Sequence, residues 1–556
     1  NNLKLNCSLY ALVTRKMISF KVFVVCLLYS ASSVLSQSAY VTVDKGEGSI
    51  IFDQGEKADS GEFVCVTLDW WPKNKCNYGV CPWTNSSILE VNLESKRLRK
   101  LVKSLGNVII RIGGTQADTI VYEDETSVPC TGFAPTDKPS SFFTGGCLTR
   151  KRWEAISKFA DETGSKIIFG INARFGREKT FLLPWDASNA RNFLSYIHMR
   201  NLTNSLIGFE FGNEISSYPA MTSQVAAEGF HQVRNLIDEV FASKQRISDR
   251  RLPLYGPDAI IFSGLPNRIK ATIDKSSSVL DGITWHSYPL GPGYNNPKLN
   301  TDIMNPSFLD RFFEQARTIG DFVSKYSHLK LIMGESGGAF NSGHNETNNR
   351  FLDAFWYLHA MGGLSKRKHS MFCRQTLVGG NYELVDKTTH LPNPSYYAAM
   401  LFKRVMGRAV LDGTLQNFDD KPEISSIAKL ARLYAHCNLK DARLGVLILN
   451  FGSMHLDVEF KGRSPDELSP RDEYFIRSPE GLHGKSVLLN NKPILFDRDG
   501  MVHLEPKRVT LTSPVSPLPP QSYAFIHFSK DSRISKSLCG FRASANLNFF
   551  PDVELE

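Results

Sequence analysis

The chain has 556 residues, of which 42% are hydrophobic and 22% charged, and its formal net charge is +9. This composition excludes a disordered chain, and the length predicts one large domain accompanied by a smaller one. No metal-ligand cluster, phosphate-binding loop or nucleic-acid motif occurs in the sequence, so we expect no metal, no cofactor and no nucleic-acid partner.

Residues 1–36 have the pattern of a leader that contains a signal peptide. Basic residues without any acidic one precede an apolar run at 22–35, and this run ends in small residues. The run is short for a membrane span, and no later stretch approaches the ~20 uncharged apolar residues that a spanning helix needs. We therefore expect a soluble protein that is secreted to the extracellular space or cell wall, or delivered to a lysosome or vacuole, with peripheral attachment to a membrane or wall as an option.

Cysteines and glycosylation sequons agree with this expectation. Eight cysteines lie outside the leader, and pairing is expected in an oxidising compartment, although the sequence alone does not prove the connectivity. The candidate pairs are Cys76 with Cys81, Cys130 with Cys147, and Cys437 with Cys539. Three sequons predict glycosylation at the surface, at Asn85, Asn201 and Asn345.

Residues 63–406 alternate short apolar, β-branched runs with longer segments of helical spacing. This alternation is typical of parallel strands joined by crossover helices. The runs are 63–70, 108–114, 166–173, 206–212, 252–258, 282–288, 329–336 and 369–377. Because there are eight of them, the sequence predicts a TIM barrel.

Residues 407–530 change to short alternating runs separated by turn residues, which predicts a smaller C-terminal β-sandwich domain. The segment 37–62 also alternates before the first barrel strand, so we expect it to join the same sandwich. Beyond residue 530 the pattern fades, and we expect 531–556 to be an irregular tail tied down only through Cys539.

Two glutamates stand where the active site of a TIM barrel forms, at the carboxyl ends of strands. The fourth run delivers Asn213 and Glu214, and the seventh delivers Glu335. Hydrolysis of a glycosidic bond needs a proton for the leaving oxygen and a carboxylate for the developing oxocarbenium carbon. Glu214 is the candidate general acid/base, Glu335 the candidate nucleophile, and the Asn213 amide a candidate partner for the sugar 2-hydroxyl. The competing interpretation is structural: Asn213 caps a helix, Glu214 favours its dipole, and Glu335 pairs with an arginine.

The chain resembles the heparanase-like glycoside hydrolases, their plant members especially, along nearly all of residues 40–530. The motifs that carry the resemblance are Arg111-Ile-Gly-Gly-Thr-Gln-Ala-Asp118, Gly208-Phe-Glu-Phe-Gly-Asn-Glu214, Thr284-Trp-His-Ser-Tyr288, Gly334-Glu-Ser-Gly-Gly338 and Gly379-Gly-Asn-Tyr-Glu-Leu-Val-Asp386. The resemblance implies a β-glucuronidase that acts by double displacement with retention, on chain ends or on internal bonds. It also implies that Glu214 is the proton donor and Glu335 the nucleophile.

The resemblance implies further substrate contacts. His286 and Tyr288 are expected to line the site, and Gly337, Gly338 and Tyr382 to grip the glucuronate carboxylate through N–H and phenol donors. Thr115 and Asp118, at the end of the second strand, are expected to contribute to the same pocket. The animal enzyme that gives this family its name has a long linker that is excised to leave two chains. Residues 121–149 contain no such linker, so we expect an active single chain.

The expected substrate is an acidic oligo- or polysaccharide, such as an arabinogalactan or heparan-type glycan, or a small aryl or flavonoid glucuronide. Basic clusters at 96–100 and 366–369 agree with an acidic glycan but are also typical of solvated surfaces. We expect a monomer. Two other functions remain open: a catalytically inactive carbohydrate-binding protein of the wall or matrix, and a glycosidase of the same fold that acts on a neutral sugar.

Overall fold

The structure is a computed structural model that describes most of the chain after the leader. The described residues are 36–44, 63–125, 130, 132–133, 145–177, 183–218, 220–241, 251–417, 429–438, 440–498 and 500–544. Residues 1–35 of the expected leader and most of the segment 37–62 lie outside these ranges, whereas Ser36 begins a described strand. Within them, no helix has the length and apolarity needed to cross a membrane.

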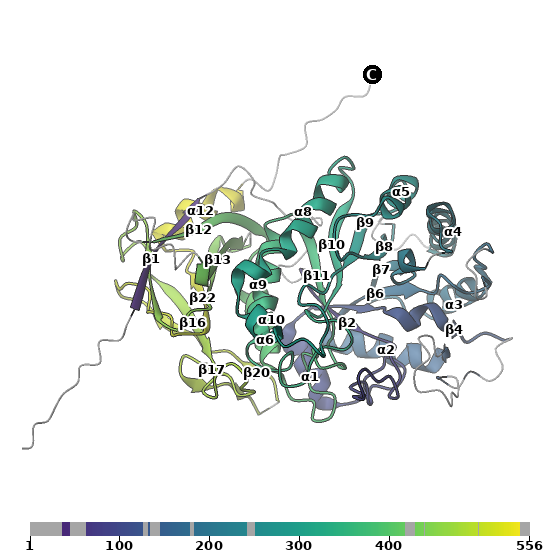
Figure 1. Cartoon of the computed structure of the whole chain (residues 1–556), viewed down its shortest axis with the longest axis horizontal. Helices are drawn as coiled ribbons and strands as arrows, with labels where there is room; N and C mark the ends of the chain where they lie inside the picture. The colour runs from purple at the N-terminus through teal and green to yellow at the C-terminus, as the bar shows by residue number, and fades with distance from the viewer. Residues whose placement is uncertain are drawn as a thin grey trace, which may run out of the picture. The chain divides into compact units, whose positions relative to one another are not determined.

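Eight parallel strands close into a barrel, which confirms the predicted TIM-barrel class (Figure 1). The strand order around the barrel is β10, β11, β2, β3, β6, β7, β8 and β9. Their bounds are β2 Val64–Leu68, β3 Ile109–Ile112, β6 Lys166–Ile171, β7 Leu206–Phe211, β8 Leu254–Ile260, β9 Gly282–His286, β10 Lys330–Ser336 and β11 His369–Arg374. Most of their residues are buried, as expected for parallel strands that are covered on both faces.

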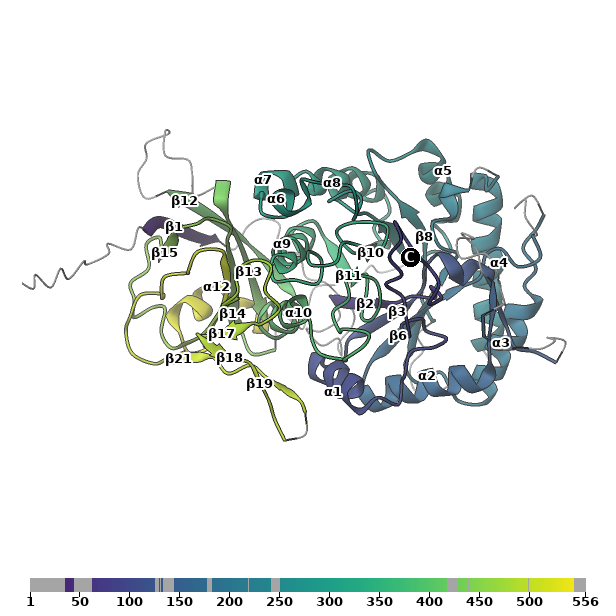
Figure 2. The same cartoon turned by 60° about the horizontal axis from the view of Figure 1, so that its bottom comes forward.

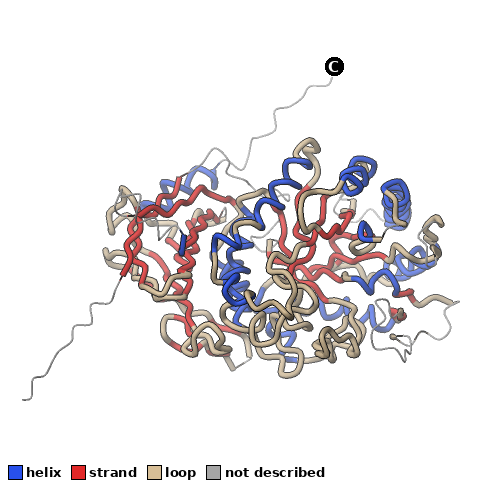
Figure 3. Tube along the Cα trace, viewed as in Figure 1, coloured by secondary structure: helices blue, strands red, loops and turns tan. Residues whose placement is uncertain are grey.

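Helices surround the barrel strands, as Figures 2 and 3 show. They are α1 Lys96–Leu105, α2 Arg150–Thr163, α3 Ser188–Met199, α4 Ser223–Phe241, α5 Asn267–Ser276, α6 Leu299–Ile303, α7 Pro306–Leu309, α8 Phe312–Val323, α9 Asp353–Ser365 and α10 Pro394–Val405. Two short 3-10 helices, η1 Thr115–Thr119 and η2 Ile215–Ser217, follow β3 and β7, and a small pair of strands, β4 Ile120–Tyr122 and β5 Gly146–Leu148, lies after η1.

The sequence explains where these helices start and stop. In α1, the Ser95 side chain accepts a hydrogen bond from the Leu98 N–H, and apolar residues recur at the spacing of one helix face. In α2, Thr149 caps the start in the same way, and Gly164 ends the helix in the left-handed conformation that glycine adopts at little cost. Apolar faces of this kind pack the helices onto the barrel.

The β-rich second part is a ten-stranded sheet, in which β12 pairs with β1 along one stretch and with β13 along another. Its strands are β1 Ser36–Asp44, β12 Ala409–Asn417, β13 Ala431–Asn438, β14 Arg443–Asn450, β15 His455–Phe460, β16 Arg471–Arg477, β17 Leu488–Leu489, β18 Lys492–Pro493, β21 Lys507–Val509 and β22 Ser522–Phe528. A separate two-stranded pair consists of β19 Leu495–Phe496 and β20 Val502–His503. β1 precedes the barrel in sequence but lies between β12 and β15 in the sheet.

Helix α9 lies at the junction of the barrel and the sheet. Every residue of α9 is buried, including its polar ones, which is typical of a helix that is enclosed on all sides. The hydroxyl of Tyr434 on β13 lies 2.8 Å from Nδ1 of His359 on α9. Phe351, just before α9, stacks on Tyr523 of β22 with ring centroids 5.6 Å apart. The two parts therefore share one hydrophobic core.

The tail differs from the sequence prediction, because the helix α12 Arg533–Ser544 forms within the stretch that we expected to be irregular. The helix buries Ile534, Leu538 and Cys539 against the core of the sheet, and this short apolar stripe is hidden in sequence by its polar neighbours. Cys539 forms a disulfide with Cys437. Residues 545–556 lie outside the described residues.

The three candidate disulfides all form, and a fourth was not predicted. Cys65 of β2 and Cys373 of β11 are bonded although they lie 308 positions apart in sequence. Both belong to a small hydrophobic cluster contributed by barrel strands. Their pairing follows from β2 and β11, the first and last barrel strands, being neighbours in the closed barrel.

Candidate active site

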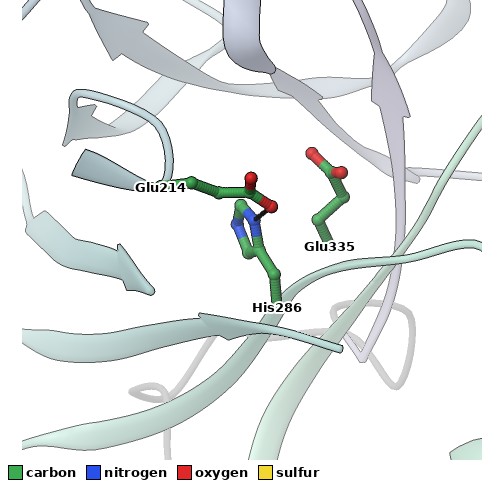
Figure 4. Close-up of side chains that lie close together, drawn as sticks. All are labelled: Glu214, His286 and Glu335. Carbon is green, nitrogen blue, oxygen red and sulfur yellow. Dashed lines mark hydrogen bonds and ion pairs between the residues drawn. The ribbon is translucent and has the colours of Figure 1, made fainter. Parts of the chain in front are cut away.

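Glu214 and Glu335 converge at the carboxyl ends of β7 and β10. One carboxylate oxygen of each, together with one ring nitrogen of His286, lie within 4.8 Å of one another. Figure 4 shows both carboxyl groups reaching into the same space, with the His286 ring beside Glu214. The Glu335 side chain is 8% exposed and that of Glu214 is 21% exposed, so Glu214 is the more accessible of the two. Two acids at this separation can act on one glycosidic bond, one on its oxygen and the other on its carbon.

The backbone around Glu214 is held in an uncommon conformation. Glu214 has a φ of 49°, in the left-handed region, and its N–H donates to the backbone oxygen of Asp258. Asp118, which is buried, accepts hydrogen bonds from the N–H of Asn213 at 2.9 Å and from the N–H of Ala173 at 2.8 Å. Asp118 thus fixes the strand end that carries Glu214 through backbone contacts, and burial raises the pKa of its carboxyl to about 7.

The capping role that the competing interpretation gave to Asn213 is not seen. Glu214, and not Asn213, occupies the cap position of η2, and no side chain caps that helix. The Asn213 Oδ1 instead accepts a hydrogen bond from Arg111 at 3.0 Å. Thr115, at the start of η1, is half-buried.

Arg111 on β3 is the centre of the charged network beneath the two glutamates, and we did not predict it as a site residue. Its fully buried guanidinium donates to Glu335 Oε2 at 2.9 Å, to Asp258 Oδ2 at 2.8 Å and to Glu210 Oε2 at 2.7 Å. Gly113 makes room for it, because a Cβ there would lie 2.6 Å from the guanidinium carbon. The arginine pairing proposed for Glu335 in the competing interpretation therefore exists, but it occurs inside the shared pocket of the two glutamates.

Three ionisable groups in this network have strongly shifted pKa values. Burial raises the pKa of Glu210 to about 8 in spite of Arg111. Burial would also raise the pKa of Asp258, but the positive charges of Arg111 and His286 lower it below its ordinary value. For His286, burial disfavours the charged ring, yet the charge of Glu335 and the contacts with Asp258 and Glu214 raise the pKa to about 10. Burial thus favours the neutral form of Glu210, whereas the surrounding carboxylates favour the charged ring of His286.

Glu335 receives a second donor from Tyr288. The phenol hydroxyl of Tyr288 donates to Glu335 Oε1 at 2.5 Å, while Arg111 donates to the other oxygen. Burial and the charge of Glu335 raise the pKa of Tyr288 well above its ordinary value, so the phenol keeps its proton. Both oxygens of Glu335 are thus oriented. His286 does the same for Glu214, since its Nδ1 lies 3.1 Å from Glu214 Oε1.

Gly337 and Gly338 follow β10, and Tyr382, after β11, packs against Gly337. A Cβ on Gly337 would lie 2.7 Å from the Tyr382 ring. Gly338 has a φ of 80°, and a Cβ on it would lie 2.6 Å from the Trp356 ring, so both positions require glycine. The backbone N–H groups of the two glycines donate to no residue in the described part of the chain. Two adjacent N–H donors beside a phenol can bind an anion.

Asp69, just after β2, is a further buried acid that sequence reasoning missed. It accepts a hydrogen bond from Gln375 Nε2 at 2.6 Å. Burial and the nearby charge of Glu335 raise its pKa to about 7. A carboxyl group that is neutral below this pH can both donate and accept hydrogen bonds to sugar hydroxyls.

Glu214, His286 and Glu335 also satisfy the distance criterion for a group of metal ligands. The charge of Glu335 and the contacts with Asp258 and Glu214 raise the pKa of His286, so these carboxylates favour a charged ring that donates to them. Its ring nitrogens also face Glu214 and Asp258, so the three residues fit acid/base work better than metal binding.

The basic clusters and the sequons lie away from these contacts. Lys96 to Lys100 belong to α1, where Arg99 pairs with Glu94 and Glu162. Lys366, after α9, lies 3.7 Å from Asp412. The sequon asparagines are exposed, at Asn85, Asn201 and Asn345.

Comparison with known proteins gives concordant matches in sequence and in structure. Residues 50–362 match the model of the glycosyl hydrolase family 79 N-terminal domain. Heparanase-like protein 2 of Arabidopsis thaliana is 31% identical over 506 residues, covering 84% of this chain and 90% of that protein. Baicalin-β-D-glucuronidase of Scutellaria baicalensis is 31% identical over 494 residues, covering 84% of this chain and 89% of that protein. Among solved structures, a 4-O-α-L-rhamnosyl-β-D-glucuronidase from Fusarium oxysporum shares the fold, with a TM-score of 0.59, 13% identity, and coverage of 88% of this chain and 100% of that one.

Proposed function

Because this chain belongs to glycosyl hydrolase family 79 and is thus a glycosidase, we propose that it is a retaining β-glucuronidase. The observation that supports this mechanism is the closeness of Glu214 and Glu335, since one carboxylate oxygen of each lies within 4.8 Å of the other. Retaining glycosidases have their two carboxyl groups ~5–5.5 Å apart, whereas inverting ones need ~6.5–9.5 Å to admit a water.

In the first step, Glu335 attacks the anomeric carbon and forms a glycosyl ester, while Glu214 gives its proton to the leaving oxygen as the glycosidic bond breaks. In the second step, Glu214 takes a proton from water, whose oxygen attacks the same carbon and releases Glu335. Arg111 and Tyr288 hold the two oxygens of Glu335 in place for this attack. His286 holds Glu214 by one oxygen, which leaves the other to carry the proton.

The substrate preference in this proposal follows from the donors around the sugar. The N–H groups of Gly337 and Gly338 and the hydroxyl of Tyr382 would bind the glucuronate carboxylate. The Asn213 amide would donate to the 2-hydroxyl, because Arg111 already occupies its oxygen. The natural substrate would be an acidic glycan of arabinogalactan or heparan type, or an aryl or flavonoid glucuronide. The relative named as a baicalin glucuronidase supports the last class.

The mechanism is tested by substituting Glu335→Gln and following hydrolysis of an aryl β-glucuronide. We expect kcat to fall by at least about a thousand-fold, since an amide cannot form the ester intermediate. Glu346→Gln, which changes an exposed glutamate after the same strand, is the matched control and should retain activity. NMR of the wild-type reaction should show the β-anomer of glucuronic acid as the first product. Initial release of the α-anomer would exclude the retaining mechanism.

We also propose that the mature protein is a secreted or vacuolar/lysosomal monomer that carries N-glycans. The four disulfides and the exposed sequons support this proposal. Expression in a secreting host, followed by enzymatic removal of N-glycans and analytical ultracentrifugation, would test the glycosylation and the monomeric state together.

A further inference from the structure

The segment between β2 and α1 forms a fixed loop that contacts the segment after β10. The Cys76–Cys81 disulfide closes the loop. Two of its side chains donate to the hydroxyl of Ser342, Asn77 Nδ2 at 2.6 Å and Trp83 Nε1 at 2.9 Å. The loop is therefore attached to the same segment that carries Gly337 and Gly338.

Aromatic side chains connect this loop to the nucleophile. We call Trp71, Trp83, Tyr288 and Tyr382 the aromatic wall, because they pack together as one cluster. The Trp83 ring lies 6.5 Å from that of Trp71 and 6.3 Å from that of Tyr382, centroid to centroid. At its other end, the wall reaches Glu335 through the Tyr288 hydroxyl. In the proposed reaction the leaving group lies beside Glu214, which protonates it, and the glycone lies on the other side of the cleaved bond. Because the aromatic wall extends from Glu335 and not from Glu214, we place it on the glycone side.

Lys75 places a cation on this wall. Its ammonium nitrogen lies 4.3 Å from the centroid of the Trp71 ring. The side chain is half-buried, and burial lowers its pKa although the charge of Asp69 opposes this effect. In the described part of the chain, no carboxylate oxygen lies within 4.0 Å of this ammonium. A partly desolvated ammonium that has no carboxylate in direct contact is costly, and an anion from the substrate would offset that cost.

We propose that Lys75 forms a cationic subsite on the glycone side of the pocket, and that this subsite binds a carboxylate or sulfate group of the substrate. The inference rests on the proposed function and extends it by adding a charged determinant to the neutral donors of Gly337, Gly338 and Tyr382. The Trp71 ring holds the Lys75 ammonium through this cation–π contact. The anion belongs either to the glucuronate itself or to an acidic sugar attached to it on the glycone side.

Calorimetric binding to the full-length protein distinguishes these two sources. The ligands are glucuronic acid, a disaccharide in which the glucuronate carries a sulfated sugar at O4, and the unsulfated disaccharide. The variants are Lys75→Met, which keeps the apolar stem, Lys75→Arg, which keeps the charge, and Lys73→Met as the matched control, since Lys73 is an exposed lysine of the same loop. Thermal unfolding of each variant establishes that the fold is retained.

We expect Lys75→Met to weaken binding about five- to tenfold, with Lys75→Arg restoring most of it and Lys73→Met leaving it unchanged. Weaker binding of all three ligands identifies the glucuronate carboxylate, and weaker binding of the sulfated disaccharide alone identifies the neighbouring sugar. Unchanged affinity of Lys75→Met for every ligand, or an equal loss in Lys73→Met, overturns the subsite. Turnover of an aryl β-glucuronide by the wild type tests the proposed function separately, because the binding measurement needs no catalysis.

Discussion

Arg111 and Glu210 form an unequal pair at the base of the site. Glu210 is buried and accepts a hydrogen bond from Arg111 at 2.7 Å, yet burial raises its pKa to about 8. The positive charge of Arg111 interacts with Glu210, Asp258 and Glu335. Asp258 and Glu335 therefore compete with Glu210 for this charge. A neutral Glu210 leaves more of that charge to interact with Asp258 and Glu335.

A carboxyl group whose folded pKa is raised makes stability depend on pH. For Glu210 both states are protonated below pH ~4, so the group has no effect there; as pH rises towards about 8, the unfolded chain loses its proton first and stability falls. Asp69 and Asp118, each with a pKa raised to about 7, act in the same direction. His286 behaves differently, because its raised pKa adds stability below pH ~6.5 that is lost only as pH rises through about 10.

Glu210→Gln should therefore flatten the pH dependence of stability. The amide is neutral at every pH, and its oxygen can still accept from Arg111. We expect the variant to lose less free energy of unfolding than the wild type between pH 4.5 and 8.5, by on the order of 1–3 kcal/mol. Urea unfolding across this range measures the difference. Parallel curves for the two proteins would show that Glu210 is ionised in the folded state throughout.

At the scale of elements, the loop after β10 owes its shape to glycines. Gly338 has a φ of 80° and lies against Trp356, so alanine there meets both backbone strain and a clash. Gly481 has a φ of 79° but nothing within 4 Å of its would-be Cβ, so alanine meets the strain alone. Alanine substitutions at these two glycines therefore separate the stability cost of the steric clash from that of the left-handed backbone conformation.

We expect Gly481→Ala to cost about 1–2 kcal/mol of stability and Gly338→Ala to cost at least ~1–3 kcal/mol more. Gly338→Ala should also raise KM for an aryl β-glucuronide, because it displaces an N–H group proposed to bind the carboxylate. Chemical unfolding and steady-state kinetics measure the two effects. Equal losses of stability in the two variants would show that Trp356 moves aside without cost.

A strand or helix could be predicted where its own residues carry the pattern that identifies it. Parallel strands buried on both faces appear in sequence as apolar runs, and for this reason all eight barrel strands were found. The two glutamates were found because each ends such a run. Arg111 and Glu210 were missed because they lie inside such runs and not at their ends, and Asp258 was missed although it ends the fifth run. Only the closed barrel brings Arg111 within hydrogen-bond distance of Glu210 and Asp258. The Cys65–Cys373 disulfide was not predicted although it joins the first and last of the predicted runs, which lie side by side in the closed barrel.

At the scale of the whole molecule, α9 joins the barrel to the sheet through a very close approach. A Cβ on Gly362 would lie 2.3 Å from the ring of Tyr434 on β13. The neighbouring Tyr434 hydroxyl lies 2.8 Å from His359 Nδ1, so this ring is held from two sides. Because the barrel and the sheet share one core across this contact, we expect them to unfold in a single cooperative transition.

Gly362→Ala should weaken this junction, and removal of the Tyr434 ring should relieve the clash. We expect Gly362→Ala to cost about 1–3 kcal/mol, and Tyr434→Leu to cost a few kcal/mol through lost packing and the lost contact with His359. The double variant should then be more stable than the sum of the two losses predicts, because alanine no longer meets an aromatic ring. Calorimetry with intrinsic fluorescence measures both the coupling and the number of transitions. Additive losses, or separate melting of the barrel and the sheet, would show that Tyr434 and Gly362 do not transmit stability between the two parts.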